Sequence, residues 1–151
     1  MAYEKSNLII GAVFYITGIL AVNFFLKDFS PAFSFHPSVE LLVVCAGLLA
    51  MSMFFYSRFS YILLFAVGIF FGSLASEKPL FVGLAFIPLT FAHWLGIEMG
   101  FAARQDFFGK TNFFAEKEKY IIFTLILLAL ALIAGVIPEY VVFKLPFAAI
   151  K

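Results

Sequence analysis

The sequence predicts an all-α polytopic integral membrane protein, a helical bundle with about five transmembrane helices. Five long apolar segments, joined by short connections, fill nearly all of the 151 residues. The composition agrees, because 64% of the residues are hydrophobic, 13% are charged and 23 are phenylalanine. Soluble domains are usually only about half apolar, and a helix that is apolar on every side must be buried or surrounded by lipid. We therefore expect residues 1–151 to form a single transmembrane domain.

The lengths of the five segments suit a bilayer. A hydrocarbon core of about 30 Å needs about 20 helical residues at about 1.5 Å each. The predicted helices cover residues 7–26, 39–56, 61–75, 80–103 and 120–142. The third segment is the shortest of the five, so its assignment as a span depends most on its neighbours.

The ends of the segments carry helix signals in chain order. The first segment presents Gly11, Gly18 and Ala21 on one thin face, which suits close packing. Pro37 and Pro79 precede the second and fourth segments, and proline suits the first helical turn, where its missing N–H costs no hydrogen bond. Short connections around the third segment predict that the second, third and fourth helices are tight antiparallel neighbours.

The fourth segment is the least uniform, because Pro88 lies in its interior. Proline removes one intrahelical hydrogen bond and clashes with the preceding turn, so we expect a kink at this residue. The polar stretch 105–119 that follows contains four phenylalanines, which indicate that it lies along the membrane interface.

The distribution of basic residues predicts an orientation. With five spans, one side of the membrane collects six of the ten basic residues, and the opposite side collects four. The six are Lys5, Arg58, Arg104, Lys110, Lys117 and Lys119. The positive-inside rule then favours a cytoplasmic N-terminus for a multi-pass protein of the cell membrane.

Three ionisable residues within or beside the spans are hypotheses for function, because such groups cost about 2.5–3.5 kcal/mol at the helix centre. They are His93, Glu98 and Glu139. His93 is the deepest, and it is either a haem or metal ligand, a proton relay, or a neutral imidazole bonded to a nearby hydroxyl or carbonyl. We favour the last reading, because ligation needs partners and His36 is the only other histidine. No metal and no cofactor are therefore expected.

The two glutamates have separate readings. Glu98 lies about 140° around the helix from His93, which excludes a dyad on one helix face. It either binds a substrate or ion, as in very small transporters, or approaches the lipid headgroups. Glu139 follows Pro138 at the end of a span. We interpret it as a residue at the membrane interface, and a role in coupling is the less favoured alternative.

Two glycine pairs at four-residue spacing predict close helix packing. Gly68 and Gly72 lie in the third segment, and Gly96 and Gly100 lie in the fourth. Glycine lets helix backbones approach closely in membranes, so these residues are assigned to packing. His93 lies within about 60° of the second pair, on the same face of the helix.

Several function classes lack their sequence signals. The chain has no H-E-x-x-H zinc helix, no G-x-S-x-G nucleophile elbow and no phosphate-binding glycine loop. It also lacks a basic cluster, and its net charge is +1, so we expect no nucleic-acid partner and no enzymatic activity. The single cysteine, Cys45, lies in an apolar stretch and is read as a packed side chain.

Three segments in the second half of the chain form a distinctive series: VGIFFG at 67–72, IPLTFAHWLGIE at 87–98 and LILLALALIAGVIPEYV at 125–141. Through these segments the chain resembles the stage II sporulation protein M-like family of small multi-pass membrane proteins. Here His93 and Glu98 are one residue further apart than in the family. In sporulating bacteria the family belongs to a membrane complex that organises cell-wall remodelling during engulfment. The resemblance implies a non-enzymatic membrane partner, with Pro88, His93, Glu98 and Glu139 as the positions to test.

Two hypotheses for function follow from these features. The leading one is a structural or scaffolding subunit that binds other integral membrane proteins, or a second copy of itself, through its small-residue faces. The alternative is a small oligomeric transporter or channel that uses Glu98 or His93. In either case the surrounding lipid bilayer is the first partner.

Overall fold

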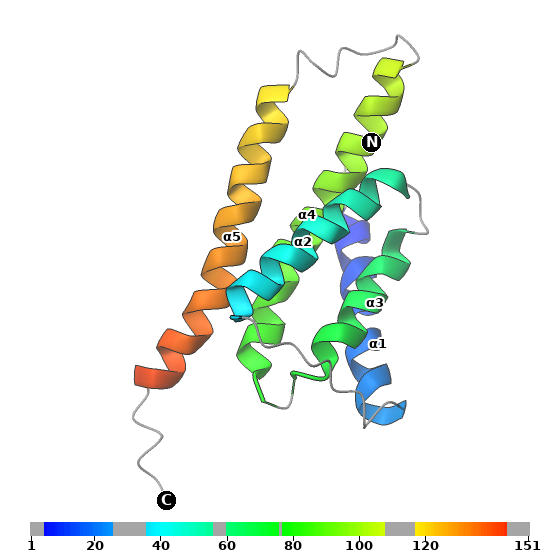
Figure 1. Ribbon diagram of the computed structural model, residues 1–151. Coiled ribbons are helices and arrows are strands. Elements are labelled where there is room, and N and C mark those ends of the chain that lie inside the picture. Colours follow the sequence, from blue (N-terminus) through cyan, green and yellow to red (C-terminus); the bar gives the residue numbers. More distant parts are fainter. Residues whose placement is uncertain (1–4, 26–35, 56–59, 76, 108–116, 145–151) are drawn as a thin grey trace, which may run out of the picture.

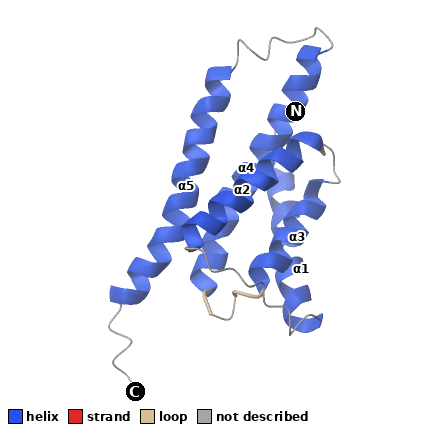
Figure 2. Ribbon diagram, in the orientation of Figure 1, coloured by secondary structure: helices blue, strands red, loops and turns tan. Residues whose placement is uncertain are grey.

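The computed structural model describes residues 5–25, 36–55, 60–75, 77–107 and 117–144, although at both ends of this set and near residue 107 it describes only backbone. Its described residues form five α-helices and contain no strand (Figure 2). The helices are α1 (Lys5–Phe25), α2 (Pro37–Phe54), α3 (Tyr61–Gly72), α4 (Pro79–Phe107) and α5 (Lys117–Lys144). Each predicted segment is helical, and α2 and α4 begin at the two predicted prolines. The all-α prediction is therefore confirmed.

Four of the helices are long and apolar enough to cross a membrane, namely α1, α2, α4 and α5. The exception is α3, whose 12 residues measure about 18 Å along the helix axis. After Gly72 the chain tightens into turns in which the amides of Leu74 and Ala75 donate to carbonyls three residues earlier. The prediction of five helices is thus confirmed, but one of them is too short to span a bilayer by itself.

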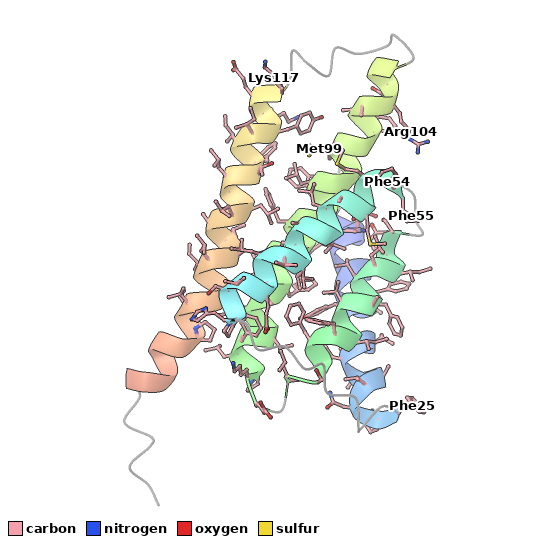
Figure 3. The ribbon with its side chains drawn as sticks, in the orientation of Figure 1. Phe25, Phe54, Phe55, Met99, Arg104 and Lys117 are labelled. Atoms are coloured by element: carbon pink, nitrogen blue, oxygen red, sulfur yellow. The ribbon has the colours of Figure 1, made fainter. Side chains whose placement is uncertain are left out.

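Successive helices run in alternating directions through the bundle (Figure 1). Arg104 near the end of α4 and Lys117 at the start of α5 therefore lie at the same end, opposite Phe25 at the end of α1 (Figure 3). This arrangement matches the alternation that the count of basic residues assumed. Which end faces the cytoplasm stays a prediction.

The helix pairs in closest contact are not neighbours in the sequence. The main partner of α3 is α1, and the main partner of α2 is α4, while α5 packs against both α4 and α2. The prediction that the second, third and fourth helices are tight antiparallel neighbours is wrong, because α3 packs mainly against α1, and α2 and α4 are close but run in the same direction (Figure 1). Since directions alternate, the two closest pairs are each parallel (Figure 1).

The central helix of the bundle is α4, which contacts all four of the others. In an apolar stretch of 18 residues within its candidate span 56% of the residues are buried, against 22% in the corresponding stretch of α1 and 28% in that of α5. The outer helices instead expose large apolar side chains, among them Phe24, Phe25, Ile121, Ile122 and Leu125. Surrounding lipid can cover these apolar outer faces. We therefore expect a site on the inward face of α4.

Pro88 is buried inside α4, and the helix continues through it from Pro79 to Phe107. The proline therefore does not end the helix, and the kink at this residue stays a prediction. Two residues later, the hydroxyl of Thr90 donates to the carbonyl of Phe86 at 2.7 Å within the same helix.

A buried hydrogen bond ties α1 to α4. The hydroxyl of Tyr15 donates to the carbonyl of Val82 at 2.9 Å, and its ring lies 5.4 Å from that of Phe86. We expect Tyr15→Phe to lower the stability of the bundle by about 0.5–1.5 kcal/mol, because it removes the donor and keeps the ring. Thr17→Val is the matched control, since the Thr17 hydroxyl is exposed and bonds to its own helix. Thermal unfolding in detergent measures both, and equal effects would contradict the prediction.

Candidate functional site

The most deeply placed titratable side chain among the described residues is His93, near the middle of the 29-residue α4. Its exposed fraction is 0%. Its Nε2 lies 2.8 Å from the hydroxyl oxygen of Ser60, a hydrogen bond between residues 33 positions apart. The ring also lies 5.1 Å from the ring of Tyr61, which in turn lies 6.2 Å from that of Phe14 in α1. The hydroxyl partner that the sequence analysis considered for His93 is therefore present.

The hydrogen-bonding partner of His93 immediately precedes α3. Serine at such a position usually accepts a hydrogen bond from a backbone amide in the first turn and so caps the helix. The Ser60 side chain makes no such bond here: its backbone is itself helical (φ −62°, ψ −21°), and its hydroxyl is directed to His93. Helix α3 therefore begins at the depth of His93 within the bundle.

The opposite end of α3 lies beside the start of α4. The ring of Phe71 meets the ring of Phe81 edge to face, with the centroids 5.6 Å apart. The short helix thus extends from the middle of α4 to its first turns and no further. This placement accounts for why a 12-residue helix is sufficient at this position.

All four predicted packing glycines lie at contacts between helices of this chain. A Cβ on Gly68 would lie 3.2 Å from the Cα of Gly18, and one on Gly72 would lie 2.9 Å from the Cα of Ile19. On α4, a Cβ on Gly96 would lie 2.5 Å from the carbonyl oxygen of Leu49 in α2. Gly100 has a similar close approach to the backbone of Met53.

These contacts change the interpretation of the small-residue faces. The sequence predicts that these faces bind other membrane proteins, but in the structure α1 and α2 of the same chain pack against them. Binding to other proteins is therefore not assigned to Gly68, Gly72, Gly96 or Gly100. Two other glycines, Gly47 and Gly83, have open space where a Cβ would lie.

The two glutamates are not part of the buried group around His93. Glu98 is partly exposed, whereas His93 is fully buried, so the two side chains have different surroundings. One turn before Glu98, the ring of Trp94 lies 5.3 Å from that of Phe123, which places this side of α4 against α5. Glu139 is a residue of α5, and the structure describes its backbone but not its side chain.

Three buried polar atoms in the described part of the chain have no hydrogen-bond partner. They are the hydroxyl oxygens of Ser38 and Ser52 and the Nδ1 of His93. Ser38 lies against Gly135 of α5, and Ser52 lies against Gly96 of α4. Native proteins satisfy nearly all buried polar groups, so each exception needs an explanation.

Several of these residues were missed by sequence reasoning. Ser52 and Ser60 look like ordinary small residues near helix ends, although the position of Ser60 before an apolar run is a helix-start signal. Glu40 was also missed, and it is 8% exposed in the first turn of α2, where a carboxylate interacts favourably with the helix dipole. Hydropathy alone does not distinguish a helix end that is buried in the bundle, such as the start of α2, from a helix end at the membrane interface.

The described residues offer no cluster suited to a metal ion. No group of three or more His, Cys, Asp or Glu side chains comes together among them. Cys45 of α2 is buried in the core and is not part of a disulfide. The site is therefore the hydrogen bond between His93 and Ser60, at the junction where α2 and the start of α3 meet α4.

Comparisons with protein-family models, with curated proteins and with solved structures gave no match to this chain. The resemblance to the stage II sporulation protein M-like family therefore stays a prediction. The fold itself has the architecture of a multi-pass membrane protein, because four of its five helices could cross a membrane.

Proposed function

We propose that this chain is a non-enzymatic subunit of a larger membrane complex, with a structural or scaffolding role. It would lie in the cell membrane with its N-terminus in the cytoplasm, as the basic residues predict. The resemblance to a family of membrane-complex proteins points in the same direction. The partners are other integral membrane proteins or further copies of the chain.

The observation that carries this proposal is the way polar side chains are used inside the bundle. The hydroxyl of the buried Thr90 donates to a carbonyl of its own helix. His93 is fully buried and bonded to Ser60. A catalytic pocket or a transport pathway needs polar groups that face a substrate or water, whereas these groups support the structure.

The large outer faces show where partners could bind. Exposed apolar side chains cover three outer surfaces, represented by Ile9 on α1 (62% exposed), Val43 on α2 (66%) and Leu125 on α5 (59%). Because small residues already pack the interior, contacts with other subunits would use these larger side chains. A subunit interface would occupy one of the three faces and leave the others to lipid.

Site-specific photo-cross-linking in native membranes tests the proposal. A photoreactive amino acid is placed at Ile9, Val43 or Leu125, and at the buried Leu64 as a control. We expect one outer position to give a discrete adduct of defined mass, identified by mass spectrometry, and the control to give none. Adducts with lipid alone at all three positions, together with a stable monomer after gentle purification, would count against a subunit role.

A small oligomeric transporter or channel is the second candidate, and one observation favours it. Helix α3 starts at the depth of His93, and helices that begin within the membrane often border the binding sites of transporters. The five helices of one chain are too few to enclose a pore, so this function would require an oligomer. Ion flux into liposomes tests it, and flux that is unchanged by both Glu98→Gln and His93→Ala would exclude these residues from the pathway.

A further inference from the structure

The junction of α2, α3 and α4 contains two of the buried polar atoms that have no hydrogen-bond partner among the described residues. They are the Ser52 hydroxyl and the His93 Nδ1, and both side chains have an exposed fraction of 0%. A buried polar group without a partner costs more than a hydrogen bond gains, because it has given up its bonds to water. Two such atoms at one junction therefore need a common explanation.

The helices bring these two side chains to the same part of α4. The Cβ of Ser52 lies 2.7 Å from where a Cβ on Gly96 would be, so α2 approaches α4 closely at that residue. Gly96 follows His93 by three residues and lies about 60° away around the helix. Ser52 thus lies within one helical turn of His93, on the neighbouring helix.

The third element at the junction is the start of α3. Ser60 directs its hydroxyl to the Nε2 of His93 and makes no side-chain cap on α3. Leu89, one turn before His93 on the same face of α4, is also fully buried and adds an apolar side chain beside it.

We propose that this junction is a binding site for one small, uncharged, hydrogen-bonding molecule of the size of water, held between the Ser52 hydroxyl and the His93 Nδ1. A hydroxyl-bearing guest both donates and accepts, so it can satisfy either tautomer of His93 and either orientation of Ser52. Water held inside proteins typically makes about three such bonds to otherwise unsatisfied groups. The result is a hydrogen-bonded connection from Ser60 through His93 and the guest to Ser52.

This inference does not depend on the proposed scaffolding role. A bound water would connect α3 to α2 across the middle of α4 in a subunit, a transporter or an isolated monomer. The connection gives the junction a defined arrangement that apolar packing alone does not specify. Photo-cross-linking at the outer faces and the experiment below can therefore fail separately.

Nitrogen-15 NMR of the histidine-labelled protein in detergent tests the site. The chain has two histidines, so two imidazoles appear, and His36→Gln identifies the signals of His93. We expect a cross-peak between exchangeable water protons and the His93 ring in the unmodified protein. Ser52→Ala should remove this cross-peak and shift the Nδ1 resonance, because the guest loses one of its partners.

Ser38→Ala is the matched control, as it makes the same change in the same helix at another unpartnered serine. Ser38 lies against Gly135 of α5, so this variant should leave the His93 signals unchanged. If Ser52→Ala yields too little folded protein, Ser52→Cys is measured in its place. Its thiol is a weaker hydrogen-bonding group, so the cross-peak should weaken.

Thermal unfolding is a second test, because a held guest and an unpartnered hydroxyl predict opposite changes in the unfolding temperature of Ser52→Ala. If Ser52 holds a guest, Ser52→Ala should lower the unfolding temperature. If the hydroxyl is simply buried without a partner, the same change should raise it. An absent water cross-peak at His93 in the unmodified protein, or a higher unfolding temperature for Ser52→Ala, would overturn the proposal.

Discussion

Replacing Gly68 with alanine is expected to lower the stability of the bundle by about 1–3 kcal/mol, the range found for overpacked cores. The added Cβ would meet the Tyr15 carbonyl oxygen and lie 3.2 Å from the Cα of Gly18. Both contacts are with backbone, so no flexible side chain can move aside to make room. Helices α1 and α3 would have to separate along their main contact.

The measurement is the fraction of folded protein that remains after heating in detergent, monitored by size-exclusion chromatography. Gly47→Ala and Gly83→Ala are the matched controls, because a Cβ at either glycine meets nothing within 4 Å. Both lie inside helices, where alanine is the better helix former, so these variants should be neutral or slightly more stable. If Gly68→Ala is as stable as the controls, then the close contact between α1 and α3 is wrong.

The helices themselves could be predicted from the sequence because lipid imposes a simple physical requirement. A spanning segment must satisfy its backbone internally and carry an apolar surface, so composition and length identify it. Pro37 and Pro79 then indicate two helix starts, and both helices begin there. The third helix was overestimated, since residues 73–75 are apolar enough to extend it although the chain turns after Gly72.

The pairing of the helices could not be predicted in the same way. A glycine pair indicates that some helix comes close, but it carries no information about which one. Short connections suggested sequence neighbours, whereas Gly68 packs against α1 and Gly96 against α2. The choice depends on the complementary surface of the partner, such as Gly18 opposite Gly68, and hydropathy does not encode it.

Of the residues at the candidate site, His93 could be predicted from the sequence, but Ser52 and Ser60 could not. His93 stands out because an imidazole inside an apolar helix is costly and therefore informative. Ser52 and Ser60 do not stand out, because serine is common in membrane helices and near their ends. Their roles arise only when α2 and the start of α3 meet α4, which is a property of the assembled bundle.

His93→Ala is expected to lower the stability by about 2–4 kcal/mol, through two separate effects. Truncation of a fully buried ring leaves a cavity in the middle of the bundle, and the surrounding helices relax only partly around it. It also leaves the Ser60 hydroxyl buried and without its partner. Thermal unfolding of the variant in detergent measures the sum of these effects.

A double-mutant cycle separates the hydrogen bond from the cavity. Ser60→Ala alone removes the hydroxyl and leaves the His93 Nε2 without a partner, so it should also destabilise the protein. In the double variant neither group is left unsatisfied, so its loss should be smaller than the sum of the single losses by about 0.5–1.5 kcal/mol. The control cycle pairs His93→Ala with Ser73→Ala, because Ser73 lies just beyond α3 and bonds to Phe70 instead. Additive losses in both cycles would mean that Ser60 and His93 are adjacent without being coupled, and α3 would then be positioned by its packing against α1 and by ring contacts such as that of Phe71 with Phe81.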